Sequence, residues 1–206
     1  MSTILSQVLH KLLSYAGQEN FKAELELAKK KFFNPVGIPG ENGETTEIEL
    51  ANFIEWFVFD WKLPGSIKLY EKYLKEESKA LDAIEKEYLK SFASYNYSLF
   101  QILKLKDRIA KVKEIISGQK FKEVYGLVPA LEEKDFILAR LINVQGQYFF
   151  TDALFYLPRG MAKYYLRRAK LVRKQKLDRE KFLEEMKVIA IKSARYPRMK
   201  LEEIYK

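Results

Sequence analysis

Apolar side chains recur at helical spacing through the first 95 residues of the chain. Between residues 2 and 15 they occupy one helix face, at Leu5, Val8, Leu9, Leu12 and Leu13. The same periodicity predicts four further helices, at residues 18–33, 48–61, 67–77 and 81–92. This part of the chain is therefore expected to form a bundle of about five helices.

The third of these helices, at residues 48–61, carries apolar side chains nearly all the way round, which is typical of a buried helix. Thr46 and Glu49 have the spacing of a capping box and predict where this helix begins. The preceding segment, residues 34–45, contains several glycines and prolines and predicts an irregular loop.

The pattern changes at residue 96 to short β-prone segments separated by tight turns. Five strands are predicted, at Tyr97–Leu105, Ile109–Ile116, Phe121–Leu127, Phe136–Asn143 and Tyr148–Leu154. Without intervening helices, such strands favour antiparallel pairing in a small sheet or a partly closed barrel. Helical periodicity returns at residues 161–176 and 178–195.

The fold class is therefore expected to be α+β, in three segments. They are a helical domain at residues 1–95, an antiparallel β-unit at residues 96–158 and a basic helical segment at residues 159–206.

Composition excludes several classes of protein. Among the 206 residues, 48% are hydrophobic, which excludes a disordered chain, and no apolar run approaches the length of a membrane span. The chain has no Cys and one His, so we expect no disulfide and no metal site, and it lacks glycine-rich phosphate loops. The first residues do not resemble a signal peptide. We expect a cytoplasmic protein with no cofactor and no membrane contact.

Positive charge is concentrated in the last quarter of the chain. Residues 159–206 hold 16 basic and 6 acidic residues, whereas the other 158 residues hold 21 basic and 22 acidic ones. On a helix at residues 161–176, four of the cations fall within roughly a 60° arc. These are Lys163, Arg167, Lys170 and Lys174, and Arg168 and Arg173 extend the candidate polyanion-binding set. The alternative is an ordinary solvated face.

Asp60 is the most unusual acidic residue, because it lies near the C-terminal end of an aromatic helix, where the helix dipole disfavours a carboxylate. We predict a structural ion pair between Asp60 and Arg140, with Arg108 as the second candidate partner. An acid–base pair of Asp60 with Glu55 is less favoured, because positions five apart lie on different sides of a helix.

Four pieces of the sequence carry a family resemblance: Phe32-Phe33 after a helix, and residues 53–60 (FIEWFVFD), 97–102 (YSLFQI) and 139–144 (ARLINV), the last followed by Gly146. They resemble an uncharacterised bacterial family whose members often end in the SEC-C zinc motif, named after the C-terminus of the secretion ATPase SecA. This chain has no Cys and so lacks that motif. The resemblance implies a shared core and no known chemistry.

The function expected from these observations is non-enzymatic binding or an adaptor role, with RNA or a nucleoprotein as the polyanionic partner. Two alternatives stay open. The first is a protein–protein interaction or self-association module, with a protein partner or a second copy of the chain, whose charge only maintains solubility. The second is an enzyme of uncharacterised activity.

Overall fold

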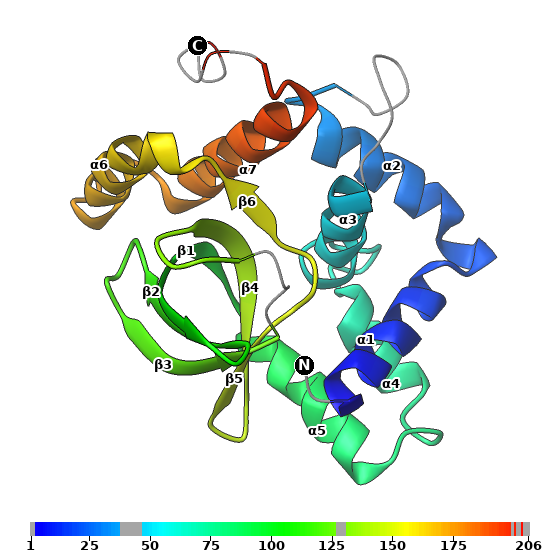
Figure 1. The fold of residues 1–206 in the computed structure, drawn as a ribbon. Coiled ribbons are helices and arrows are strands. Elements are labelled where there is room, and N and C mark those ends of the chain that lie inside the picture. Colours follow the sequence, from blue (N-terminus) through cyan, green and yellow to red (C-terminus); the bar gives the residue numbers. More distant parts are fainter. Residues whose placement is uncertain (1–2, 38–46, 127–130, 199, 201–202, 204–206) are drawn as a thin grey trace. The chain divides into compact units, whose positions relative to one another are not determined.

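The computed structural model describes residues 3–37, 47–126, 131–198, 200 and 203 (Figure 1). The chain divides into two compact units, a helical unit of residues 1–95 with 142–146, and a barrel unit of residues 96–141 with 147–206. The three-segment division expected from the sequence stays a prediction. Most of the expected loop, and the expected helix cap Thr46, lie outside the described residues.

Helices make up most of the described part of the helical unit, at the positions that the apolar periodicity predicts, and residues 142–144 are the end of a strand. The helices are α1 (Thr3–Ala16), α2 (Lys22–Phe33), α3 (Glu47–Phe59), α4 (Leu69–Glu76) and α5 (Ala83–Ser91), with 3-10 turns at Glu19–Phe21 and Phe92–Ser94. Helix α1 packs against α3, α4 and α5, and α3 also packs against α2 and α4. The apolar α3 is thus the helix around which this unit is built, as its sequence predicts.

Aromatic rings dominate the core of the helical unit. The buried ring of Phe59, at the end of α3, lies 5.7 Å from Tyr70, 5.2 Å from Phe92 and 5.5 Å from Tyr95, measured between ring centroids. Tilted and edge-on pairs of this kind contribute about 0.5–1.5 kcal/mol each beyond the burial of their apolar area. The aromatic content of the sequence near residues 53–61 therefore serves packing.

A closed barrel forms the centre of the second unit (Figure 1). Its strands, with one additional edge strand, are β1 (Asn96–Lys106), β2 (Ile109–Glu114), β3 (Lys120–Tyr125), β4 (Phe136–Val144), β5 (Gln147–Phe150) and β6 (Phe155–Leu157). The strand order is β1-β2-β3-β5-β4, and β1 also pairs with β4, which closes the ring. The five predicted strands are confirmed, and β6 is an addition to them.

The sheet is mixed, although antiparallel pairing was expected throughout. Strands β3 and β5 pair in parallel, with Val124 opposite Tyr148 and Tyr125 opposite Phe149. The reason is geometric: strand direction cannot alternate all the way round a closed ring with an odd number of strands, so one neighbouring pair must be parallel. The ring here has five strands, so closure forces the parallel pair.

Alternating side chains from the strands fill the barrel. Phe100, Ile102, Val112, Val124 and Phe150 are each 0% exposed and belong to one apolar cluster. Consecutive strand residues point to opposite faces, so the residues between them point outward. The outer face of the barrel therefore consists of the residues that alternate with these apolar residues along each strand.

Two helices complete the barrel unit, α6 (Ala162–Arg173) and α7 (Arg179–Arg195), after a 3-10 turn at Arg159–Met161. The carboxylate of Asp178 accepts a hydrogen bond of 2.9 Å from the backbone N–H of Lys181 and so caps α7. Helix α7 packs against β6, β1 and α6. Within the described ranges, none of the helices combines the length and apolar character that crossing a bilayer requires.

Candidate functional site

Helix α6 is held to its unit by a small apolar face. Tyr165 and Ala169 are both 0% exposed, and the ring of Tyr165 lies 5.5 Å from that of Phe136 in β4. The hydroxyl of Tyr165 donates a hydrogen bond of 3.1 Å to the backbone carbonyl of Pro158. Burial raises the pKa of this phenol above its usual range, so it stays protonated. Helix α6 therefore docks through one side.

The other side of α6 presents cations to solvent. We use the name α6 basic face for five exposed basic residues of α6 and its C-terminal cap. Lys163, Arg167, Lys170 and Lys174 lie on this side, and Arg173 lies nearer the docked side. None of the five forms an ion pair with any described residue. The guanidinium of Arg167 lies over the ring of Tyr164, 5.7 Å from its centroid. Five of the six candidate cations are thus accessible.

Arg168, the sixth candidate, has a different environment. Its Nε and Nη2 atoms both donate to Oε2 of Glu185 in α7, at 3.0 and 2.6 Å, and the hydroxyl of Tyr164 donates to the same carboxylate. The Arg168 and Glu185 side chains are 28% and 22% exposed. Arg168 therefore joins α6 to α7. Leu166 is 42% exposed, because it lies beyond the strip of α6 that Tyr165 and Ala169 bury.

The ion pair predicted between Asp60 and Arg140 stays a prediction, because the two residues belong to different units. Within the helical unit, Asp60 accepts a hydrogen bond from the hydroxyl of Tyr95, and that hydroxyl accepts one of 3.2 Å from Nζ of Lys68. Within the barrel unit, Arg140 is 1% exposed in β4, and its guanidinium lies 5.0 Å from the ring centroid of Tyr97.

A second group of cations was missed by the sequence analysis. Strands β1, β2 and β3 carry Lys104, Lys106, Lys111, Lys120 and Lys122, all exposed. The signal was present as lysines that alternate with apolar residues, in the phrases KLK, KVK and KFK at residues 104–106, 111–113 and 120–122. Counting charge over long segments concealed it, because residues 1–158 hold nearly equal numbers of basic and acidic residues.

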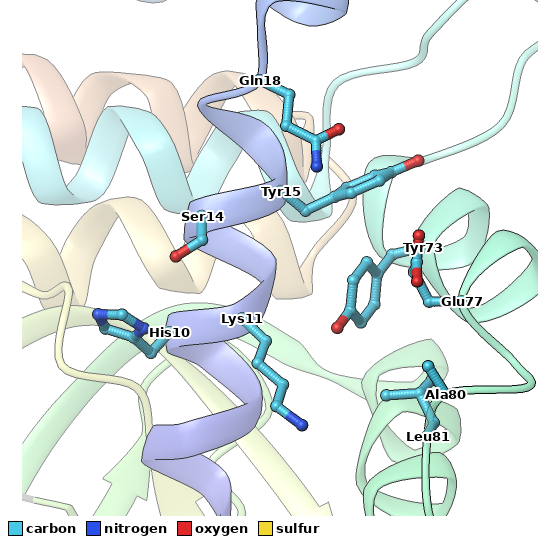
Figure 2. A pocket seen from close by; sticks show the side chains of 9 residues that line it. All are labelled: His10, Lys11, Ser14, Tyr15, Gln18, Tyr73, Glu77, Ala80 and Leu81. Atoms are coloured by element: carbon cyan, nitrogen blue, oxygen red, sulfur yellow. The ribbon is translucent and has the colours of Figure 1, made fainter.

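A pocket of about 390 Å³ lies in the helical unit, between α1 and the segment that contains α4. Figure 2 shows that His10 and Ser14 extend to one side of α1, whereas Lys11 and Tyr15 extend toward Tyr73. The rings of Tyr15 and Tyr73 are 5.0 Å apart between centroids. The one histidine of the chain is therefore turned away from the tyrosines that line this pocket.

Two polar groups of this pocket form hydrogen bonds with neighbouring carboxylates. The ammonium of Lys11 donates to Glu85, and the hydroxyl of Tyr15 donates to Glu76. Burial and the hydrogen bond to Glu76 together raise the pKa of Tyr15 above its usual range. A phenol that stays protonated and bound to a carboxylate is not poised to remove a proton, so we assign no acid–base role to the pocket.

Metal binding has no support among the residues that the structure describes. In this part of the chain, no group of three or more His, Cys, Asp or Glu side chains is arranged to hold a metal ion.

Comparison with known proteins places the chain in a family but assigns no activity. The sequence model of a family of unknown function, DUF7986, matches residues 5–188, which include every helix and strand from α2 to α6 and most of α1 and α7. No curated protein and no solved structure matches the chain. Because the match spans both compact units and most of the sequence, the chain belongs to the family of unknown function DUF7986.

Proposed function

We propose that this protein is a non-enzymatic binding or adaptor protein that contacts RNA or a nucleoprotein through the α6 basic face. The observation that carries the proposal is the group of five exposed cations without an ion pair among the described residues, on a helix whose opposite side is docked. Each phosphate neutralised by such a cation releases condensed counterions, which favours binding.

Helix stability alone does not explain these charges. Cations near the C-terminal end of a helix interact favourably with its dipole, which accounts for Lys170, Arg173 and Lys174. Lys163 lies in the first turn of α6, which contains no acidic residue, and there the dipole disfavours a positive charge. A cation kept where it destabilises its own helix supports a role in binding.

The contact expected from this surface is with phosphates rather than with base edges. Lys163, Lys170 and Lys174 offer point charges, which position a nucleic acid without reading its sequence. We therefore expect affinity that depends strongly on salt and weakly on sequence.

The test uses a variant, called the α6 quartet, in which Lys163, Arg167, Lys170 and Lys174 are changed to Gln. Binding of a fluorescent 20-nucleotide single-stranded RNA is followed by anisotropy between 50 and 200 mM salt. We expect at least a tenfold loss of affinity at low salt. The slope of log K against log salt should fall by about 3, since each phosphate contact contributes about 0.7 for a single strand.

A matched control removes the same charge from the helical unit. Lys30, Lys75, Lys79 and Lys90 are exposed, and changing them to Gln gives the helical-unit quartet. If the α6 quartet and the helical-unit quartet lower affinity equally, α6 is not the binding surface. Association of the purified protein in gel filtration, without RNA binding, would favour the self-association alternative.

Two further expectations belong to the same proposal. A cytoplasmic location suits a partner such as RNA, and cell fractionation tests it. The resemblance to the SEC-C-bearing family rests on Phe32-Phe33 and on the phrases at residues 53–60, 97–102 and 139–144. We propose that this resemblance reflects common ancestry of the core.

A further inference from the structure

The outer face of strands β1, β2 and β3 is unusually basic. The stretch from Lys104 to Lys122 contains seven basic residues and two acidic ones, Asp107 and Glu114. Glu114 is 3% exposed, and its carboxylate accepts hydrogen bonds from Ser98 and Ser117. The acid that faces solvent within this stretch is therefore Asp107, at the turn between β1 and β2, and Glu123, the next residue of β3, is also exposed.

The pleat of the strands puts these cations on one face. In β2, Ala110 and Val112 point into the barrel and are 0% exposed, whereas Lys111 between them is exposed. In β1, the register shifts after Ile102, so that Leu105 packs on the core, and Lys104 and Lys106 point outward. Apolar residues fill the barrel while the alternating lysines cover its outside.

The register places like charges directly opposite each other. Lys104 pairs with Lys111 across β1 and β2, and Lys113 pairs with Lys120 across β2 and β3. Like charges in directly opposite positions destabilise a sheet. None of these four lysines forms an ion pair with a described residue. The fold therefore retains two repulsive lysine pairs that its own stability does not require.

The same face contains a hollow. It has a volume of about 390 Å³ and is lined by Lys104, Lys106, Asp107, Ile109, Lys111 and Lys122. The half-buried Ile109 and the methylene stems of the lysines provide apolar surface below the ammonium groups. The hollow thus offers an apolar base under a rim that carries four cations and one carboxylate.

We propose that this face is a second binding site, and that its ligand is single-stranded RNA. A single strand presents both unpaired bases, which fit an apolar hollow, and linked phosphates, which fit lysines. Lys113 and Lys120 extend the charge beyond the hollow, so a chain of phosphates matches the face better than one nucleotide does. The ligand class is shared with the proposed function, but the site does not depend on α6.

The test is binding of a fluorescent 12-nucleotide oligouridine to the full chain at 50 and 200 mM salt. In the barrel quartet, Lys104, Lys106, Lys111 and Lys122 are changed to Gln. We expect at least a tenfold loss of affinity and a fall in salt slope of about 3. Circular dichroism and a thermal melt establish that each variant is folded, and the helical-unit quartet serves as the matched control.

A second variant should bind RNA more tightly, a result that general damage to the protein cannot explain. Asp107 has φ +51°, a conformation that Asn also adopts readily, so Asp107→Asn should fold normally. It removes the carboxylate from the rim of the hollow, and we expect about a twofold to threefold gain in affinity for the oligouridine. No gain would contradict the placement of RNA over this hollow.

The two sites can fail separately. Loss of binding in the barrel quartet but not in the α6 quartet supports this inference and contradicts the proposed function. The reverse result, with the barrel quartet behaving like the helical-unit quartet, overturns the inference alone. Stronger binding of a 12-base-pair duplex than of the single strand, or full competition by ATP at equal phosphate concentration, overturns the assignment to single-stranded RNA.

Discussion

The two compact units differ in charge far more than in size. The helical unit holds 12 basic and 15 acidic residues, whereas the barrel unit holds 25 basic and 13 acidic ones. The barrel unit therefore has a net charge of +12 and the helical unit one of −3, which together give the +9 of the chain. This separation indicates that the two units experience different requirements, because a uniform need for solubility would place charge on both.

Both units have aromatic rings in the core, and both pair some cations with their own carboxylates. These cations are Lys11 and Lys72 in the helical unit, and Arg159, Arg168 and Lys187 in the barrel unit. The barrel unit closes its sheet into a ring and leaves cations outside, on α6 and on the outer face of β1 to β3. Both binding surfaces proposed above therefore lie in the barrel unit.

Removing both sets of cations should have the largest effect. We expect the combination of the barrel quartet and the α6 quartet to lower affinity for the 12-nucleotide RNA by about 100-fold or more at 50 mM salt. The helical-unit quartet should change it less than about twofold. Anisotropy titrations measure both. If the variant with all eight substitutions still binds RNA with an affinity within tenfold of that of the original chain, the difference in charge between the units does not reflect RNA binding.

Asp60→Ala addresses whether an ion pair joins the helical and barrel units. If Asp60 neutralises the buried guanidinium of Arg140, the substitution should lower the free energy of unfolding by about 4 kcal/mol, because it leaves a buried charge without its counter-charge. Chemical denaturation measures the loss. A double-mutant cycle with Arg140→Ala should give a coupling energy of about 1–3 kcal/mol. A coupling energy near zero would show that the two residues do not form an ion pair.

Gly126→Ala tests how closely the barrel is packed. Gly126 has φ +86°, and a Cβ there would lie 2.4 Å from the carbonyl oxygen of Phe150. Backbone strain and this clash together should cost about 3 kcal/mol of unfolding free energy. In the helical unit, Gly65 has φ +85° with nothing within 4 Å of the added Cβ, so Gly65→Ala should cost about 1 kcal/mol. Equal losses in thermal or urea unfolding would contradict the close approach.

Arg167 and Arg168 provide the smallest and sharpest contrast, because they are adjacent on α6 but have different surroundings. Arg168→Gln should lower the unfolding free energy by about 1 kcal/mol, since it breaks a two-point contact with half-buried Glu185. It should leave RNA affinity within about twofold, whereas Arg167→Gln should lower affinity about threefold with little change in stability. The opposite assignment would show that Arg168 leaves Glu185 to bind RNA.

Much of the secondary structure could be predicted because it depends on local periodicity. The stripe from Leu5 to Leu13 became α1, and the expected helix start at Asp178 coincides with a capping carboxylate. Most strand limits were also predicted to within two residues, because tight turns such as Gln145–Gly146 separate the strands, but the fifth strand ends at Phe150 rather than at Leu154. The candidate cations on α6 were found for the same reason, since they share one helix.

The β-prone pattern from residue 96 to residue 154 determined that strands form, and apolar stripes at helical spacing determined where helices form. Both depend on neighbours in the sequence. Only the tertiary structure decided that the barrel closes, which makes β3 and β5 parallel, and that Arg168 pairs with Glu185 while Arg167 faces solvent. It alone placed Lys104 opposite Lys111 and Lys113 opposite Lys120. These features depend on strand register and on contacts between residues distant in the chain, which local periodicity does not specify.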